Sequence, residues 1–216
     1  FFDAIGCWGP RSCIAMSDPV EGRFVLRQLN FHAAGGSNHG GLAARMPGAI
    51  SGEAAFAASG TCLITLGRTQ AFMVSGGNDA RVFRSDDRGL TWSVADTPLP
   101  KGTPGSGIFS IAMRDTKNGV IVGGNYEKPD EALNNLAFTA DGGRTWIAGK
   151  GLTGYRSAVA YIDSRTIIAV GTNGTDISFD SGRTWRKIGG ENLNAVAAKG
   201  KRSVWAVGPA GSVARL

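Results

Sequence analysis

The 216-residue sequence has few of the residues that usually build reactive or metal sites. It contains only two His and three Cys. His32 and His39 lie seven residues apart without a matching Cys or acidic pair, so the pattern predicts neither a metal site nor a histidine base for a serine nucleophile. No run approaches the roughly 18 consecutive apolar residues of a membrane-spanning helix. We therefore expect no metal and no transmembrane segment.

Patterns for nucleotide binding and secretion are also missing. GSG at 105–107 stands in a predicted loop before a strand, whereas a nucleotide site needs a strand, a Gly-rich turn and a helix in that order. We therefore expect no cofactor. No segment resembles a signal peptide, but the chain begins at Phe1 instead of Met, so this says little about its compartment.

Clusters of one charge sign are absent as well. The net charge is +6, and 16 of the 23 basic residues are Arg that are scattered singly along the chain. A nucleic-acid binder more often gathers its basic residues into one stripe. We therefore expect no nucleic-acid partner.

What the sequence has in abundance is glycine, with 33 Gly against only 8 Pro. This balance indicates many tight turns, and the segments between them are rich in Val, Ile, Phe and Ala. The composition predicts an all-β protein.

Three segments repeat one eight-residue pattern, in which Ser or Thr, Asp, Gly, Thr and Trp hold fixed positions. They are SDDRGLTW at 85–92, TADGGRTW at 139–146 and SFDSGRTW at 178–185, and we call them the box segments. Their Asp can accept backbone N–H groups of a tight turn, their Gly can adopt a positive φ, and their Trp can fill space between sheets. The residues assigned this structural role are Ser85, Asp87, Gly89, Trp92, Asp141, Gly143, Trp146, Asp180, Gly182 and Trp185.

A second register of apolar anchors predicts five repeated units. Ile5, Ile64, Ile111, Val159 and Val196 are each followed twelve residues later by Ser or Gly. Between each pair the sequence reads as a strand, a turn and a second strand, and a third strand follows. A fourth begins near each box Trp, and four short antiparallel strands make a β-propeller blade. The predicted units are approximately 1–51, 52–104, 105–152, 153–190 and 191–216.

The two ends of the chain differ from the central units. The last unit has no fourth strand within the sequence, which predicts that one or more N-terminal blades precede Phe1 in the parent protein. The first unit lacks a box segment, and its Gly-rich stretch at 31–48 is predicted to be a mobile loop.

These motifs resemble the Asp-box (BNR) repeat β-propellers related to the photosystem II stability and assembly factor. Besides the box segments, MSDPVEGRF at 16–24, GEAAFAASGT at 52–61, GGNYEKPDE at 123–131 and GYRSAV at 154–159 are similar to the bacterial branch of that family. The resemblance implies about seven blades in the full protein, an exported location in the periplasm or outside the cell, and a scaffold role in assembling a membrane protein.

Strand order divides the predicted propeller into two faces. In a four-stranded antiparallel blade, the turns from strand one to two and from three to four share one face, which carries the box segments. The other face holds the remaining connections and the longest insertions, and loops on rigid scaffolds often bind ligands. Binding is predicted on this loop-rich face, at Asp3, Asp18, Glu53, Asn78, Asp79, Tyr126, Tyr155 and Arg156, with Lys128 and Asn173 beside them.

Five of these candidates also have a structural interpretation. Asp18 can initiate a turn before Pro19, and Glu53 can cap a short helix in its Ala-rich insertion. If Asp3 is buried, its carboxylate needs a partner such as Arg156, and that pair would then be structural. Tyr126 and Tyr155 can stack on a ligand or simply cover the channel mouth.

The leading functional hypothesis is a non-enzymatic scaffold that binds a protein partner. The alternative is a sialidase-like or other glycan-acting hydrolase, because sialidases share the Asp box and the propeller. Their chemistry needs an Arg triad, a Tyr, a Glu and an Asp, and only Arg156 can be placed on the loop-rich face from the sequence. No catalytic residue is therefore assigned.

The three cysteines yield one prediction about redox state. Cys7 and Cys13 lie symmetrically about the turn between the first two strands, and directly opposed residues of an antiparallel pair can be bridged. We expect a disulfide between them and a free Cys62. The alternative is three buried, reduced thiols.

Overall fold

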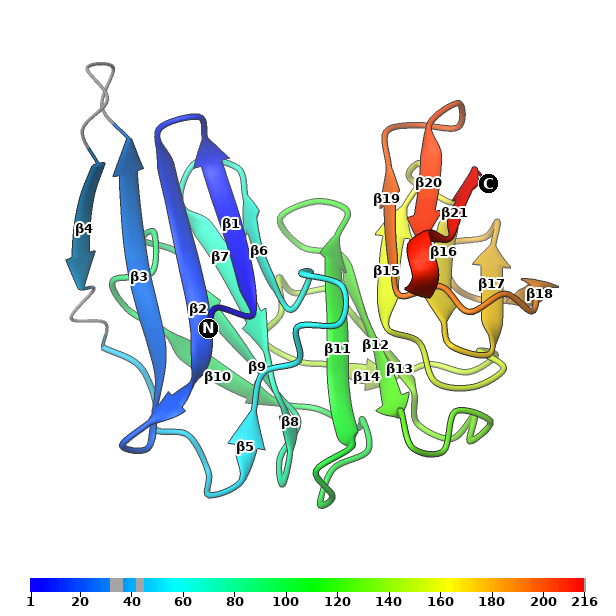
Figure 1. Cartoon of the computed structure of the whole chain (residues 1–216), viewed down its shortest axis with the longest axis horizontal. Helices are drawn as coiled ribbons and strands as arrows, with labels where there is room; N and C mark the ends of the chain where they lie inside the picture. Colours follow the sequence, from blue (N-terminus) through cyan, green and yellow to red (C-terminus); the bar gives the residue numbers. More distant parts are fainter. Residues whose placement is uncertain (32–36, 42–44, 216) are drawn as a thin grey trace.

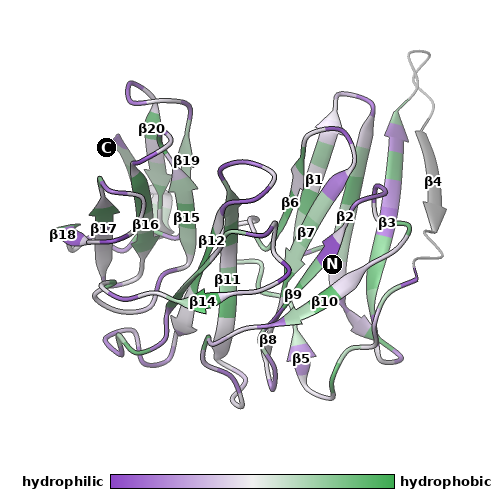
Figure 2. Ribbon diagram, turned by 180° about the vertical axis from the view of Figure 1, so that it is seen from behind, coloured by the Kyte–Doolittle hydropathy of each residue, from purple (hydrophilic) through white to green (hydrophobic). Residues whose placement is uncertain are grey.

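The structure, a computed structural model, describes residues 1–31, 37–41 and 45–215 and is almost entirely short antiparallel strands. Within these residues five sheets follow one another along the chain, from the β1–β4 sheet to the β19–β21 sheet (Figure 1). The strands are short because Gly-containing turns interrupt each apolar run. Figure 2 shows hydrophobic residues along the strands and mostly hydrophilic residues in the connections.

Each sheet takes its strands in chain order or in reverse order, as successive hairpins require. The first contains β1 (Ala4–Gly9), β2 (Ser12–Val20), β3 (Arg23–Phe31) and β4 (Ser37–Gly41). The second contains β6 (Leu63–Leu66), β7 (Gln70–Val74), β9 (Arg81–Ser85) and β10 (Ser93–Asp96). The fourth contains β15 (Ala158–Tyr161), β16 (Ile167–Gly171), β17 (Gly174–Ser178) and β18 (Arg186–Gly189).

The third and fifth sheets depart from this pattern. The third contains β11 (Ser106–Met113), β12 (Gly119–Asn125), β13 (Leu136–Thr139) and β14 (Ile147–Ala148), and it is extended by β8 (Gly76–Gly77) and β5 (Glu53–Ala54). Gly76 pairs with Gly107, where a Cβ on Gly107 would lie 2.2 Å from the Gly76 Cα. The fifth contains β19 (Ala195–Ala198), β20 (Val204–Val207) and β21 (Val213–Arg215), with the 3₁₀ turn η1 (Pro209–Gly211) before β21.

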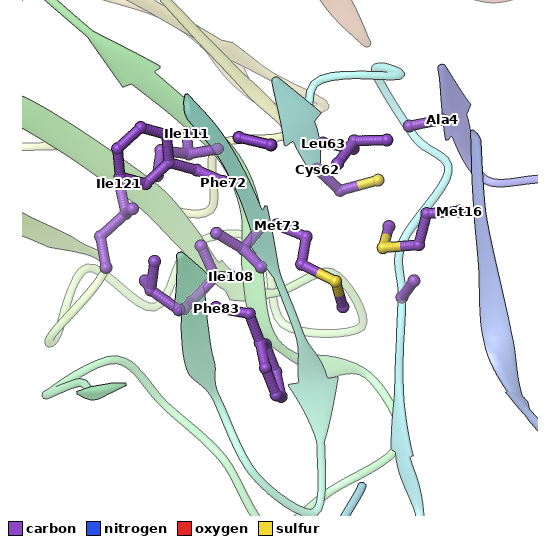
Figure 3. Close-up of a cluster of buried hydrophobic side chains, with 14 of the residues drawn as sticks. Ala4, Met16, Cys62, Leu63, Phe72, Met73, Phe83, Ile108, Ile111 and Ile121 are labelled. Atoms are coloured by element: carbon purple, nitrogen blue, oxygen red, sulfur yellow. The ribbon is translucent and has the colours of Figure 1, made fainter. Parts of the chain in front are cut away.

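The first strands of consecutive sheets, β1, β6, β11, β15 and β19, contact one another in sequence. Three clusters of buried apolar side chains fill the spaces between the sheets. The largest joins the first three sheets and includes Met16, Phe72, Met73, Phe83 and Ile121 (Figure 3). The others join the third sheet to the fourth and the fourth to the fifth. Each blade therefore buries its apolar surface against its neighbours.

The all-β prediction is confirmed, as is the prediction of four-stranded antiparallel blades. One expectation about the first unit is wrong in part. β4 lies within the stretch 31–48 that was expected to be a loop, because Ser37–Gly41 pair with β3 in place of a box-derived fourth strand. Residues 32–36 and 42–44 of that predicted mobile loop lie outside the described residues, and so does His32. None of the described helical segments is long and apolar enough to cross a membrane.

Candidate functional site

The box segments form three copies of one hydrogen-bonded turn. In the second copy the Asp141 carboxylate accepts the Thr145 backbone N–H at 3.0 Å and the Thr145 hydroxyl at 2.6 Å, and the Thr139 hydroxyl donates to it at 2.8 Å. The Gly143 N–H then donates to Thr139 Oγ1, with Gly143 at a φ of +84°. Asp87 and Asp180 have the same partners in their own segments. The repeated spacing therefore closes a local turn.

The charge state of the box carboxylates follows from these donors. Burial alone would raise the pKa of Asp141, but the Thr145 and Thr139 hydrogen bonds outweigh it and lower that pKa to about 2. The Thr184 bonds lower the pKa of Asp180 to about 2 as well. Trp92 and Trp146 are buried between sheets, and Trp185 is partly buried against the second apolar cluster. The box residues thus act within the fold.

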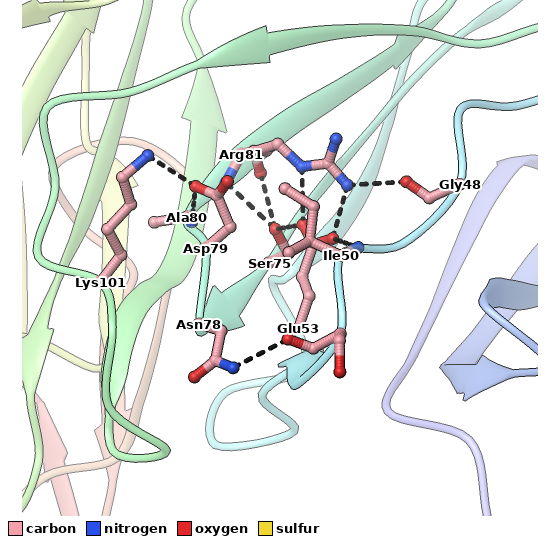
Figure 4. A network of polar contacts seen from close by, with 10 residues as sticks. Gly48, Ile50, Glu53, Ser75, Asn78, Asp79, Ala80, Arg81 and Lys101 are labelled. Carbon is pink, nitrogen blue, oxygen red and sulfur yellow. Dashed lines mark hydrogen bonds and ion pairs between the residues drawn. The ribbon is translucent and has the colours of Figure 1, made fainter.

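On the loop-rich face, Glu53 lies at the centre of a buried polar network (Figure 4). Arg81 Nε donates to Glu53 Oε1 at 3.0 Å, and the Ile50 N–H donates to Oε2 at 2.8 Å. The Ser75 hydroxyl also donates to Glu53, whose side chain has no exposed surface. The alternative interpretation of Glu53 as the cap of a short helix is wrong, because this residue begins β5 and its carboxylate is engaged by Arg81.

Asn78 and Asp79 stand beside this network and hold neighbouring segments together. Asn78 Nδ2 donates to the Ser51 carbonyl at 2.8 Å, and Lys101 Nζ contacts Asp79 Oδ1 at 2.7 Å. Burial alone would raise the pKa of Asp79, but the hydrogen bonds from Lys101 and the Ala80 N–H outweigh it, so the pKa of Asp79 is lowered. Both side chains therefore already have partners within the fold.

Arg156 forms the second buried ion pair of this face. Its side chain is fully buried, and Nε donates to Asp176 Oδ2 at 2.8 Å. Its other nitrogens donate to Asn173 Oδ1 and Thr153 Oγ1, both at 2.7 Å. The alternative in which Arg156 is the partner of Asp3 is wrong, because Arg156 pairs with Asp176 in β17. The pair links the connection before β15 to the third strand of the same blade.

Asp3 and Asp18 lie together at the start of the chain. Asp3 is buried, and within the part of the chain that the structure describes its Oδ2 has no hydrogen-bond partner. Burial, followed by the nearby charge of Asp18, raises the pKa of Asp3 to about 6. Asp18 is exposed and accepts the Ala55 N–H at 2.9 Å. The turn expected at Asp18 is wrong, since β2 continues through it to Val20.

Four aromatic rings form a cluster that the sequence did not reveal. Phe56 and Phe109 stack with centroids 4.0 Å apart, and Tyr155 meets Phe109 edge-on at 4.7 Å. Tyr155 is buried, which favours its structural interpretation over stacking on a ligand, and burial raises its pKa. Tyr126 meets Phe109 edge-on at 6.2 Å and is 47% exposed. Tyr126 is therefore the ring of this cluster most open to a partner.

The segment 125–134 carries Tyr126 and is held at several points along its length. The Tyr126 N–H donates to the Gly105 carbonyl, and the Tyr155 N–H donates to the Pro129 carbonyl. Asn173 Nδ2 donates to the Pro129 carbonyl at 2.7 Å and to Asp130 Oδ1 at 2.8 Å. Leu133 in the same segment is 77% exposed, and Lys128 and Glu131 form an exposed ion pair. The segment thus presents apolar and charged side chains from a fixed backbone.

The cysteines lie in the first two blades. Cys7 and Cys13 are joined by a disulfide across the β1–β2 hairpin, where they are directly paired. Cys62 is a buried free thiol, and burial with the nearby Asp3 charge raises its pKa to about 12. Among the described residues no group of three or more His, Cys, Asp or Glu is placed to hold a metal ion, and His39 lies in β4.

Comparison with known proteins gives structural likeness only. No protein-family model matches the chain, and no curated protein matches its sequence. The Niastella koreensis GH74 enzyme superposes with a TM-score of 0.69 at 13% identity over 95% of this chain and 33% of its own. The GH74 xyloglucanase from Xanthomonas campestris superposes with a TM-score of 0.66 at 15% identity, over 95% of this chain and 34% of the xyloglucanase. YCF48 from Cyanidioschyzon merolae superposes with a TM-score of 0.44 at 14% identity, over 93% of this chain and 78% of YCF48.

The two GH74 superpositions fit the blade arrangement described above. The chain spans about a third of the length of the two GH74 proteins. At 13% and 15% identity the likeness shows the fold and leaves the activity open. The chain has the fold of a β-propeller built from four-stranded antiparallel blades.

Proposed function

We propose that this chain is a non-enzymatic propeller scaffold that binds a protein partner on its loop-rich face. The observation that carries the proposal is the segment 125–134, which is held by hydrogen bonds from three other connections while it exposes Tyr126 and Leu133. A fixed loop loses little conformational entropy on binding, and exposed Tyr beside apolar and charged residues is typical of protein interfaces.

The polar residues of this face support binding better than catalysis. Glu53 and Arg156 are engaged in buried ion pairs with Arg81 and Asp176. Arg156 also donates to Asn173, which in turn holds the segment 125–134. A sialidase-like site would need free arginines for a substrate carboxylate, and Arg81 and Arg156 already have carboxylate partners. Their role in the proposal is to hold the binding loops.

The disulfide bears on where the scaffold works. Disulfides persist in oxidising compartments and are rare in the cytosol. The Cys7–Cys13 bridge therefore supports an exported location, in the periplasm or outside the cell. Together with the family resemblance of the motifs, this favours a role in assembling or stabilising an envelope or membrane complex.

The test is capture of partners from the native envelope with two matched double variants. Tyr126→Ser with Leu133→Ser should lower the amount of captured partner at least tenfold, since truncating a Tyr that anchors an interface costs about 2 kcal/mol or more. Leu90→Ser with Ile147→Ser changes two exposed apolar residues elsewhere and should capture as much as the wild type. Arg156 is left unchanged, because breaking its buried pair would destabilise the fold.

Two outcomes would contradict the proposal. One is equal capture by both double variants. The other is robust turnover of a fluorogenic glycoside that Asp3→Asn abolishes, since Asp3 is the buried carboxyl of this face whose pKa is raised to about 6. That second result would favour the hydrolase.

A further inference from the structure

A groove of about 490 Å³ lies away from the loop-rich face, between the second and third blades. It is lined by Arg84 and Asp86 of the second blade, by residues 91–95 in and after the first box segment, and by Gly143 and Arg144 of the second box segment. The hydrogen bonds within the box segments account for the turns but leave this groove unexplained.

Arg84 is the unusual residue of the groove. Its side chain is only 10% exposed, and its buried Nε has no hydrogen-bond partner among residues 1–31, 37–41 and 45–215. Within the described part of the chain its guanidinium donates one side-chain hydrogen bond, from Nη2 to Asp86 Oδ1. A guanidinium has five N–H donors, and a buried donor without a partner is costly. In folded proteins such a donor is completed by a bound water or by a ligand.

The other repeats show that packing does not require an arginine here. The residue before the box segment is Phe138 in the third blade and Ile177 in the fourth. Phe138 lies against Gly182, where an added Cβ would be 2.3 Å from the ring. In the second blade the cross-strand partner Phe72 lies against Gly143 instead. Because Phe72 supplies the packing, Arg84 is free to place a charge in the groove.

The other charges near Arg84 leave the groove cationic. Asp86 is shared between Arg84 and Gln70 Nε2, the latter at 2.9 Å. Arg144 is exposed, and among the described residues its side chain donates to the Asp141 carbonyl at 2.7 Å and pairs with no carboxylate, so it adds a second positive charge. The residues that line the groove therefore include two arginines and one acidic side chain, with Asp141 and Lys117 beside them in the adjoining hollow.

We propose that this groove binds the oxyanion group of a ligand through Arg84 and Arg144. Guanidinium groups match the planar, multidentate geometry of carboxylate, sulfate and phosphate, which share this chemistry. The groove is larger than one such ion, and Trp92, Val94 and Ala95 supply apolar surface for the remainder of the ligand. The site is separate from Tyr126 and Leu133, so either proposal can fail without the other.

The test follows the Arg84 Nε–Hε resonance by NMR in the full chain at constant ionic strength. Sodium sulfate, phosphate and acetate are titrated in turn, with sodium chloride as the control salt. We expect a saturable shift of this resonance with at least one oxyanion and none with chloride. The oxyanion with the tightest binding identifies whether the natural group is a sulfate, a phosphate or a carboxylate.

Variants tie the signal to the groove. Arg144 is exposed, and Arg144→Gln should raise the apparent Kd at least fivefold. Arg183→Gln, at the same box position in the fourth blade, should leave the Kd unchanged. Arg84→Lys keeps the charge but loses the fork, and calorimetry on it should show at least tenfold weaker binding. The same non-saturable shift in every salt, or unchanged affinity in Arg144→Gln and Arg84→Lys, would overturn the proposal.

Discussion

Single carboxylates stabilise the box turns, and the second segment gives the clearest test. Asp141→Ala removes the acceptor for the Thr139 hydroxyl and for both donors of Thr145. Hydrogen bonds to charged groups contribute about 1.5–3 kcal/mol, and this partly exposed turn should lie at the lower end, near 1.5 kcal/mol. Urea unfolding measures the loss, and partner capture should be unaffected. Asp96→Ala, on exposed β10, is the control, and an equal loss there would contradict the role of Asp141.

The same prediction has a pH dependence with a definite sign. The folded pKa of Asp141 is lowered to about 2, while an unperturbed Asp titrates near about 3.9. The stabilisation is therefore fully present above pH 4 and is lost as the pH falls through 2. The difference in unfolding free energy between wild type and Asp141→Ala should shrink over that window. A constant difference would mean that the ionised carboxylate is not responsible.

At the level of single residues, the sequence predicted the roles of the box residues better than the long-range partners of Glu53 and Arg156. The roles assigned to the box residues follow from local spacing, because their partners lie within four positions. Arg81 and Asp176 could not be foreseen, since each pairs with a residue more than fifteen positions away, across a blade connection. Phe56 and Phe109 were missed for the same reason. The lone aromatic residue in GEAAFAASG was the one signal that could have drawn attention to the cluster.

Among the elements, the β1–β2 hairpin places Cys7 directly opposite Cys13. We expect the bridge to survive purification without reductant, because the hairpin holds the two residues in one register. Alkylation under denaturing, non-reducing conditions followed by intact-mass analysis should add one label per chain, on Cys62. After reduction it should add three. Three labels without reduction would contradict the disulfide and with it the support for export.

Strands were predictable where apolar alternation and turn residues agreed. The predicted third strands correspond to β3, β9, β13, β17 and β21. β4 was missed because a Gly-rich segment carries no apolar alternation, and it forms by pairing with the edge of β3. β5 and β8 were missed because two-residue strands depend on a close approach of glycine backbones between blades. Tertiary contacts decide such elements, and propensity does not.

At the scale of the whole molecule, the fold follows from the repeated blade unit. Units that cannot bury their own apolar faces must stack, and the three core clusters each lie between neighbouring blades. In such an array, stability is a sum of terms within blades and between nearest neighbours. A change in one interface should then be felt mainly on its two sides.

Ile168 in β16 tests this locality, because it is fully buried in the cluster between the fourth and fifth blades. Ile168→Ala should cost about 3 kcal/mol through lost burial and a residual cavity. Hydrogen exchange followed by mass spectrometry should then show faster exchange in β15–β21 and unchanged protection in β1–β3. Phe72→Ala, in the cluster that joins the first three blades, should give the reverse pattern. Equal acceleration of all blades by either variant would instead show that the propeller unfolds as one cooperative unit, so that the repeats share a single stability.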